Sequence, residues 1–541
     1  MPVAQIQTVG ERHQTAWRWR PEKSLLTGDA SLVATWTALV LLIYLRPVSD
    51  SDIFWQLRLG ELIVSRGGLV DREPFSQLHL GEPLSHVAWG GQVIMASVRG
   101  LFGWSGLKLF DALCWTGGFA AVGLACRRLG APAPSIAFAW LAGMVAALPM
   151  AMLRPQSLAA LCFGLLLALR MLPLRTGPKI TLGCLLLAIW QNLHPSVAVA
   201  AIAMGAAAAT GWLVFWRDRT RAAPLAETAF ALFAAASVLL TPDGLAIFAT
   251  SAKNAELAVM VGVSEWLPAI APLNRLVAVP VLLITALAAR LLWPRRRALD
   301  LTSLAIAAAL LLMTVAAYRF VLFYAIALVP PLAATRLFAE QPAAGPEAAT
   351  QPRDKRAVAL AGIACAIVAA LAVALFPPSF SNHIPFKAME KLRETGASGT
   401  IFADSAQGGA LIDTGYPEWR VAMDGRFYRY SRAEWKDMMA IRAGRLGLAY
   451  VEQRYRPSAL VLWRARQAPL IAEISRKPGH WRQIWSDAGF VVFAREQDRE
   501  QQGDHRKHDR VAQDADVAQV HVAARDAGKA RKRQQPARDH P

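Results

Sequence analysis

Long apolar blocks recur along most of this chain, and they constrain its fold more than any other feature of the sequence. Each block holds roughly 17 to 22 apolar residues, the length that crosses about 30 Å of hydrocarbon as an α-helix. A helix satisfies its own backbone hydrogen bonds, so helices are the expected way to cross a bilayer. Because 55% of the residues are hydrophobic and 18% are charged, the composition excludes an ordinary soluble protein of this length.

The apolar blocks predict about eleven transmembrane helices joined mostly by short connections. We therefore expect an α-helical polytopic membrane protein with a small C-terminal α/β extracytoplasmic domain. The expected spans cover residues 30–47, 106–126, 132–150, 156–172, 179–193, 196–215, 226–242, 276–293, 299–317, 320–337 and 357–376.

Lys and Arg residues gather in every second connection between these spans. They are Arg18, Arg20, Lys23, Arg127, Arg128, Arg175, Lys179, Arg217, Arg219, Arg221, Arg295, Arg296, Arg297, Arg353, Lys355 and Arg356. Basic connections mark the cytoplasmic side. We therefore expect a protein of the inner (cytoplasmic) membrane, with residues 1–29 in the cytoplasm and everything after about residue 377 outside. The net charge of +19 then reflects topology, and no nucleic-acid partner is expected.

The first outer loop, residues 48–105, is long enough to fold on its own. Trp55, Leu59 and Ile63 recur at helical spacing, and glycines follow them. This pattern predicts a helix lying in the membrane interface with its tryptophan at headgroup level. A second apolar stretch, residues 87–102, is either interfacial or a short extra span.

The texture of the sequence changes where the transmembrane domain, residues 30–379, ends. Residues 380–496 combine short β-type runs with helical patterns, which predicts one small α/β domain outside the membrane. The β-type runs are Thr400–Ala403, Arg420–Met423, Ala459–Trp463 and Val491–Ala494. Residues 497–541 are nearly all polar or charged and have no period, so we expect them to be disordered.

The predicted topology places the unusual polar residues of the spans and outer loops at one membrane face. They are Asp50, Asp52, His86, Arg154, Gln156, Asn192, His194, Glu265 and Arg319. Ionisable groups next to hydrocarbon are costly unless paired or wet, so such a set indicates a functional site. Each member also has a simpler interpretation. Asp52 is a good N-cap, Arg154 and Arg319 are able to reach lipid phosphates, and His194 stands at a helix end.

Several short motifs together resemble the glycosyltransferase C superfamily of membrane proteins. In chain order the motifs are Asp50-Ser51-Asp52-Ile53-Phe54-Trp55-Gln56-Leu57, Gly60-Glu61-Leu62-Ile63, Glu73-Pro74-Phe75-Ser76, His86-Val87-Ala88-Trp89, Arg154-Pro155-Gln156, Trp190-Gln191-Asn192-Leu193-His194, Thr241-Pro242-Asp243-Gly244, Glu265-Trp266, Arg319-Phe320, Gly408-Gly409-Ala410-Leu411 and Met423-Asp424-Gly425-Arg426. Each motif alone is weak, and their order along most of residues 30–495 carries the resemblance.

The resemblance implies an enzyme that takes a sugar, a hexose or a pentose, from a polyprenyl-linked donor. It passes the sugar to a glycan, lipid or protein acceptor at the extracytoplasmic face. Asp52 is the first candidate for the catalytic base and Asp50 the second. Expected substrate-binding residues are His86, Arg154, Gln156, Asn192, His194, Glu265, Arg319, Asp424 and Arg426. A divalent cation, Mg or Mn, held by Asp50, Asp52 and Glu265 is a further expectation.

Two other classes of protein remain open. One is a transporter or flippase for lipid-linked saccharides, which would show repeats and broken helices along a path through the membrane. The other is a non-catalytic membrane subunit of envelope glycan assembly. A subunit of that kind would tolerate changes at Asp50 and Asp52 but not in its outer domain.

Overall fold

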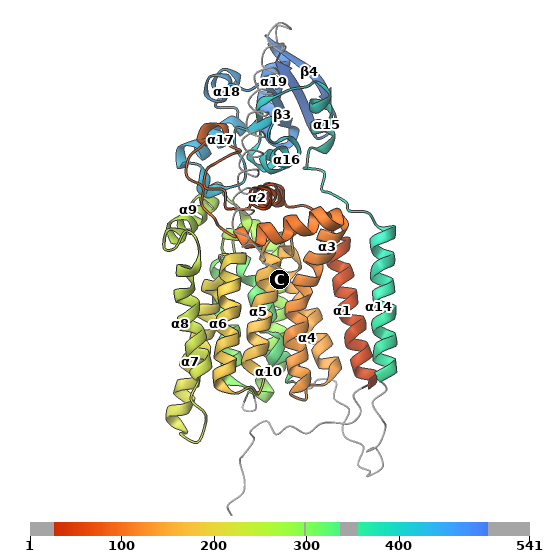
Figure 1. Ribbon diagram of the computed structural model, residues 1–541, viewed down its shortest axis with the longest axis vertical. Helices are drawn as coiled ribbons and strands as arrows, with labels where there is room; N and C mark the ends of the chain where they lie inside the picture. The colour runs from red at the N-terminus through yellow and green to blue at the C-terminus, as the bar shows by residue number, and fades with distance from the viewer. Residues whose placement is uncertain (1–25, 297–298, 336–354, 496–541) are drawn as a thin grey trace, which may run out of the picture.

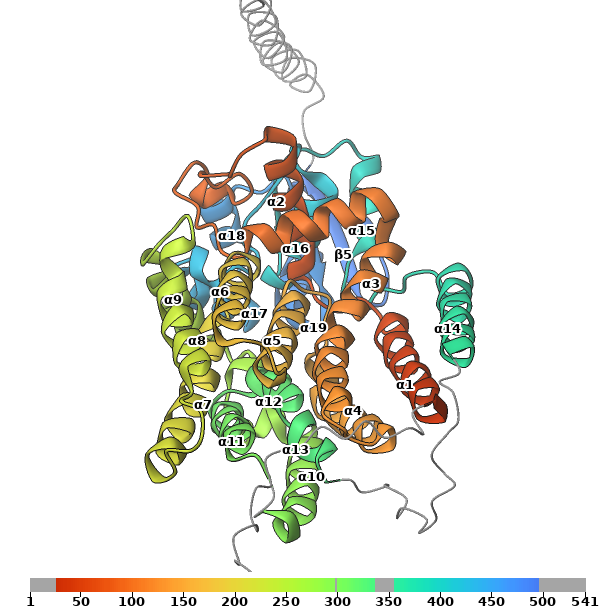
Figure 2. The same cartoon turned by 60° about the horizontal axis from the view of Figure 1, so that its bottom comes forward.

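The computed structural model describes residues 26–296, 299–335 and 355–495. A bundle of helices forms one half of the molecule, and a smaller unit with a β-sheet covers one end of the bundle (Figure 1). The predicted cytoplasmic segment before residue 26 and the predicted disordered tail lie outside the described residues. Figure 2 views the same arrangement with the opposite end of the bundle turned forward.

Apolar helices make up the bundle. Their bounds are α1 Leu26–Leu45, α3 Trp89–Arg128, α4 Ala133–Ala147, α5 Gln156–Met171, α6 Thr176–Leu193, α7 Val197–Arg217, α8 Leu225–Ala236, α10 Arg275–Leu292, α11 Leu301–Ala316, α12 Val321–Ala327, α13 Val329–Ala333 and α14 Lys355–Leu375. Four helical segments of the described residues are long and apolar enough to cross a membrane, namely Trp89–Arg128, Ala133–Met150, Val197–Arg217 and Pro272–Arg295. Six further apolar segments count only 10–17 residues by the same criterion, so the figure of about eleven spans stays a prediction.

Helix α3 contains a sharp bend. The bend bears on whether residues 87–102, the second apolar stretch of the first outer loop, form an interfacial helix or a short extra span. Gly103 has φ 63° and ψ −166°, a backbone conformation that breaks the helix. The segment before the bend lies across the end of the bundle, and the segment after it runs down into the bundle (Figure 1). Leu101 and Phe102 next to the bend are 75% and 68% exposed. The structure therefore favours an interfacial helix over an extra span.

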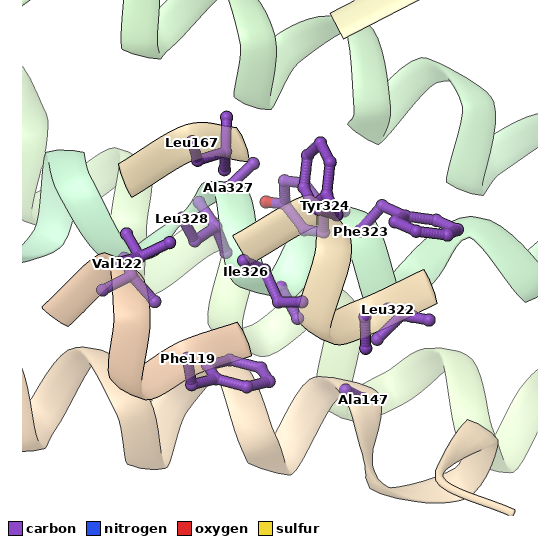
Figure 3. Close-up of a cluster of buried hydrophobic side chains, with 14 of the residues drawn as sticks. Phe119, Val122, Ala147, Leu167, Leu322, Phe323, Tyr324, Ile326, Ala327 and Leu328 are labelled. Carbon is purple, nitrogen blue, oxygen red and sulfur yellow. The ribbon is translucent and has the colours of Figure 1, made fainter. Parts of the chain in front are cut away.

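Close helix crossings and one broken helix fill the centre of the bundle. A Cβ on Gly118 of α3 would stand 2.3 Å from Ala160 O of α5, so these helices touch backbone to backbone. The predicted span 320–337 is divided into α12 and α13. The division lies just before Pro330 and Pro331, which have no N–H for the helical ladder. Figure 3 shows side chains of α12 packed against Phe119, among others.

The outer unit is built on a five-stranded sheet in the order β2-β1-β3-β5-β4. The strands are β1 Gly399–Ala403, β2 Trp419–Val421, β3 Ala459–Trp463, β4 Trp481–Ser486 and β5 Phe490–Arg495. β1 runs parallel to β2 and β3, while β5 is antiparallel to β3 and β4. The prediction missed β4, an edge strand that buries Trp481 and leaves most of its other residues exposed or half-buried.

Helices cover this sheet and connect it to the bundle. They are α2 Asp52–Arg66, α9 Ala246–Val261, α15 Phe386–Glu394, α16 Ser405–Gly415, α17 Arg432–Arg442, α18 Leu448–Tyr455 and α19 Arg464–Arg476. The predicted interfacial helix is α2, which lies between the bundle and the sheet (Figure 1). It ends at Gly67 in the left-handed conformation, φ 66°. A Cβ on Gly409 of α16 would stand 2.3 Å from Ser51 O, so the glycine motif serves this close packing.

Candidate active site

A cavity of about 170 Å³ lies where the outer ends of the bundle helices meet α2, α9 and the outer unit. Seven of the residues singled out in the sequence line it: Asp52, Arg154, Gln156, His194, Glu265, Arg319 and Arg426. The remaining four, Asp50, His86, Asn192 and Asp424, stand outside its lining. Side chains from segments hundreds of residues apart in the sequence therefore meet in one space, and we treat this cavity as the candidate active site.

Asp52 opens helix α2 and turns its carboxylate toward this cavity. Asp50 Oδ1 accepts a hydrogen bond from the Asp52 backbone N–H at 2.8 Å, so Asp50 takes up an N–H at the helix start. Asp52 Oδ1 accepts one from Trp55 Nε1 at 3.3 Å. The side chain of Asp52 is thus available to a ligand, and its simpler interpretation as an N-cap does not hold.

The surroundings of Asp52 favour its protonated form. Burial raises the pKa of this carboxyl to about 7, the nearby acids Glu265 and Asp424 add to the rise, and the Trp55 hydrogen bond opposes it. A carboxyl with a pKa near neutrality is suited to accepting and releasing a proton at physiological pH.

Arg154 pairs with two acids, of which Glu265 lines the cavity and Asp50 does not. Its Nε pairs with Asp50 Oδ2, and its Nη1 lies 3.2 Å from Glu265 Oε1. Burial of Glu265 disfavours its charge, but Arg154 and Arg319 outweigh that effect and hold the pKa of Glu265 below its usual value. Glu265 therefore stays ionised, and Arg154 is paired with two protein carboxylates while it also lines the cavity, so its expected role in binding substrate stays a prediction.

Arg319 is less tightly engaged than Arg154. Its Nη1 lies 4.0 Å from Glu265 Oε1, and its guanidinium carbon lies 3.8 Å from the centre of the Trp266 ring. A guanidinium on an aromatic face keeps its N–H edge available, and that planar edge matches a phosphate oxygen pair. The structure therefore presents Arg319 as a cation able to meet an anionic ligand in the cavity.

His194 lies beside both guanidinium groups. Burial, followed by Arg319 and Arg154, lowers the pKa of His194 to about 3, so the imidazole is neutral at pH 7. Its Nδ1 lies 2.9 Å from Ser196 Oγ, and the residue follows the last turn of α6. His194 thus both ends a helix and lines the cavity as an uncharged hydrogen-bonding group.

The predicted cation site is not assembled. Asp50 and Glu265 turn to Arg154, which leaves Asp52 alone among the three carboxylates that were expected to share a metal. Across residues 26–296, 299–335 and 355–495, no group of three or more His, Cys, Asp or Glu side chains is placed to hold a metal ion. The residues present do not fit a cation, because a guanidinium already neutralises two of the three acids.

Arg426 belongs to a second ion cluster, sealed inside the outer unit. Its Nη1 and Nη2 lie 2.6 and 2.9 Å from the two Glu73 carboxylate oxygens, and its Nε lies 2.9 Å from Asp424 Oδ1. The side chains of all three residues are 0% exposed. Arg426 and Asp424 were expected to bind substrate; the structure engages both with protein partners.

The sealed cluster also fixes the turn that meets Asp52. Gly425 stands between Asp424 and Arg426, and a Cβ at this position would lie 2.1 Å from Asp52 Oδ1. A side chain at this position would displace the Asp52 carboxylate from where it stands. The outer unit therefore forms part of the wall around Asp52, and Glu73 connects that wall to the first outer loop.

His86 and Asn192 take part in packing between loops and helices. His86 Nδ1 lies 2.7 Å from Asp243 Oδ1, and its Nε2 lies 2.9 Å from Asp71 Oδ1. Asn192 Oδ1 accepts a hydrogen bond from Trp89 Nε1 at 2.8 Å. These contacts orient the start of α3, and any substrate-binding role of the two side chains stays a prediction.

Sequence reasoning missed one wall of the cavity. Thr250, Ser251 and Asn254 of α9 line it, together with Tyr428 of the outer unit. The predicted spans 226–242 and 276–293 leave the α9 segment in the connection between them, with no helix expected there. The one available signal was the apolar spacing of Ile247, Leu257 and Ala258, the three buried residues of α9.

Comparison with known proteins supports the fold alone. The sequence matches no protein-family model, and no curated protein sequence matches it. Among solved structures, ArnT from Cupriavidus metallidurans in the apo state is similar, with a TM-score of 0.52 and 14% identity over 86% of this chain and 98% of that one.

Weaker likenesses are to two structures of the Archaeoglobus fulgidus oligosaccharyltransferase. The one tethered to an acceptor peptide has a TM-score of 0.49 and 11% identity, over 88% of this chain and 74% of that one. The apo form has a TM-score of 0.45 and 11% identity, over 88% and 75%. The match to ArnT shows that the two proteins share a fold, in agreement with the resemblance drawn from the sequence motifs.

Proposed function

We propose that this protein is a membrane glycosyltransferase that moves a sugar from a polyprenyl-linked donor to an acceptor at the extracytoplasmic face of the inner membrane. The observation that carries the proposal is the position of Asp52, which opens on the same cavity as Arg154 and Arg319. A base and two phosphate-binding cations within one cavity are what transfer from a lipid phosphate requires. The ArnT-like fold supports the same class.

In the proposed reaction, Asp52 accepts the proton of an acceptor hydroxyl. The acceptor oxygen forms a bond to the anomeric carbon, and the bond from that carbon to the phosphate oxygen breaks. The electron pair of the broken bond stays on the lipid phosphate, whose added charge Arg319 and Arg154 stabilise. Attack and departure occur on opposite faces of the sugar, so the anomeric configuration inverts.

We place the cavity at headgroup level, the depth that such a donor needs. Helix α2 and the first segment of α3 lie across the end of the bundle (Figure 1), and Asp52 is the first residue of α2. A polyprenyl chain would remain in the bilayer while its phosphate rises to the headgroup level.

The test is transfer by the purified full chain in lipid nanodiscs, with synthetic short-chain polyprenyl-phosphate hexose and pentose donors. Acceptors are supplied as a lipid and glycan extract of cells lacking the gene. Asp52→Asn should lower turnover roughly 10²- to 10⁴-fold, the contribution of a general base. Arg319→Lys should lower it less, because a point charge replaces a bidentate fork.

Asp71→Asn is the matched control. Asp71 belongs to the same outer loop as Asp52, but its side chain is 78% exposed and stands outside the cavity lining. If Asp52→Asn and Asp71→Asn both kept full turnover in folded protein, the base assignment would be wrong. Donor consumed without a glycosylated product, or donor moved across the nanodisc unchanged, would favour a transporter.

A further inference from the structure

The wall of the cavity formed by α9 differs in chemistry from the rest of its lining. Thr250, Ser251 and Asn254 line the cavity. Positions 250 and 254 are one helical turn apart, so their side chains share one face of α9. By contrast, Leu245 just before this helix and Phe248 on it are apolar and 64% and 55% exposed.

The outer unit continues this wall with its turn at residues 425–428. Phe427 stacks on Trp435 with ring centroids 4.6 Å apart and an interplanar angle of 23°, which holds the turn in place. Burial raises the pKa of Tyr428, so its phenol stays protonated and both donates and accepts hydrogen bonds. The one charged lining residue of the turn, Arg426, is 0% exposed and bound to Glu73 and Asp424.

Charge is therefore confined to one part of the lining. Asp52 begins α2, Arg154 and Arg319 lie just before α5 and α12, and Glu265 lies in the short turn that follows α9. Among the described lining residues, α9 and the turn at residues 425–428 add hydroxyl, amide and aromatic groups, and their only ion is the sealed Arg426. Asp52 stands at the border of the two parts, because its carboxylate lies against Gly425.

Resting on the proposed function, we propose that α9 and the turn at residues 425–428 form the acceptor subsite, and that the acceptor is an uncharged saccharide. Asn254 and Tyr428 are its specificity-determining residues. Amide and hydroxyl groups match the ring hydroxyls of a sugar, and an aromatic ring matches its C–H face. An ionic acceptor would lose hydration against this wall without gaining a counter-ion.

The same division assigns the donor. Its phosphate belongs with Arg319 and Arg154, its sugar lies next to Asp52, and the attacking hydroxyl approaches Asp52 from the side of α9. In this proposal, an acceptor bound on α9 presents its hydroxyl to Asp52, and inversion requires that this hydroxyl attack the sugar from the face opposite the leaving phosphate.

The experiment measures steady-state kinetics of the full chain in nanodiscs with one polyprenyl-phosphate hexose donor and three acceptors. The acceptors are an uncharged alkyl disaccharide, the same disaccharide phosphorylated, and a serine-containing peptide. Asn254→Ala should raise the KM for the uncharged disaccharide about tenfold, the effect of one lost hydrogen bond, with donor KM within about twofold. Asn254→Gln should restore part of the loss, and Tyr428→Phe should act in the same direction.

Asn254→Lys reverses the chemistry of the wall and sharpens the test. It should shift the ratio of kcat/KM for the phosphorylated over the uncharged disaccharide upward by at least about tenfold, because a cation now faces the phosphate. Lys253→Ala is the matched control, since Lys253 is an exposed neighbour on α9 that does not line the cavity. Preference of the wild-type protein for the peptide or the phosphorylated disaccharide would overturn the inference, as would an Asn254→Ala effect on donor KM.

Binding separates this inference from the proposed function. The Asp52→Asn variant should still bind the radiolabelled alkyl disaccharide, and adding Asn254→Ala should weaken that binding about tenfold. Binding without transfer to any acceptor by the wild-type protein would refute the proposed glycosyltransferase and leave a saccharide site. Transfer without any Asn254-dependent binding would refute the acceptor subsite alone.

Discussion

Two clusters of this protein have the same composition and opposite settings. At the cavity, Arg154 holds Asp50 and Glu265, and its side chain is 21% exposed. In the outer unit, Arg426 holds Glu73 and Asp424, and all three side chains are 0% exposed. A guanidinium at a cavity wall is able to exchange a carboxylate for a substrate phosphate, whereas a sealed one fixes structure. Access to a ligand, rather than residue type, therefore distinguishes a candidate binding group from a positioning group.

The sealed cluster should respond most strongly to mutation. Arg426→Ala leaves two buried carboxylates without their cation, which costs about 3–5 kcal/mol of the free energy of unfolding. Thermal unfolding of the purified full chain in nanodiscs, together with protease resistance of the outer unit, measures this loss. An Arg426→Ala protein as stable as the wild type would show that the cluster does not hold the outer unit in place.

The open cluster should lose activity instead. Arg154→Ala should lower transfer roughly 10²- to 10³-fold, the effect of removing one preorganised cation from the leaving phosphate. Its melting temperature should fall less than that of Arg426→Ala, because Glu265 lines the cavity and water there is able to solvate its unpaired carboxylate. If Arg154→Ala and Arg426→Ala lowered the melting temperature equally, the distinction between an open and a sealed cluster would be wrong.

Protonation of Asp52 should make both transfer activity and stability depend on pH. Its pKa is raised to about 7, so the deprotonated base becomes available as pH rises, and transfer should increase about tenfold per unit between pH 5 and 7 and then level. The free energy of unfolding should change in the opposite direction and fall as pH rises. A raised folded-state pKa gives stability that is lost as pH rises through 7, so Asp52→Asn should melt above the wild type at pH 8 more clearly than at pH 5. A pH-independent difference would contradict this assignment.

The exposed ion pair between α9 and the outer unit should matter least. Arg432 and Glu256 pair with 57% and 55% of their side chains exposed. Arg432→Ala should change the free energy of unfolding by about 1 kcal/mol or less, because water and salt screen such pairs. A loss as large as that from Arg426→Ala would mean that surface pairing, not the sealed cluster, fastens the outer unit.

The sequence grouped several candidate site residues at one face of the membrane, but it did not predict which of them would pair. Asp52, Arg154, His194, Glu265 and Arg319 were grouped at one face by topology, and the structure brings all of them to one cavity. Their pairings were not predictable. Asp50 was expected as a base and as a metal ligand, yet it binds Arg154 and the start of α2, because the fold brings a guanidinium to it from a segment far along the chain.

The misses have a common origin. Strand β4 and helix α9 are edge elements whose outer faces carry exposed side chains, so their hydrophobic pattern is thin. The partnership of Glu73 and Arg426 joins residues 353 positions apart, and local spacing carries no information over that distance. The motifs containing them were visible in the sequence, but their role in packing the outer unit onto the first outer loop was not.

The sequence by itself determined that apolar segments form helices and that a mixed α/β unit follows the bundle. It also predicted that basic residues lie in every second connection, with the unusual polar residues at the opposite face. These features depend on periodicity and composition within single elements, which act before any tertiary contact forms. Only the tertiary structure decided which cation is sealed and which is open, that Gly425 meets Asp52, and that α9 closes the cavity with neutral groups. Those outcomes depend on burial and close packing between distant segments, and the three-dimensional fold creates both.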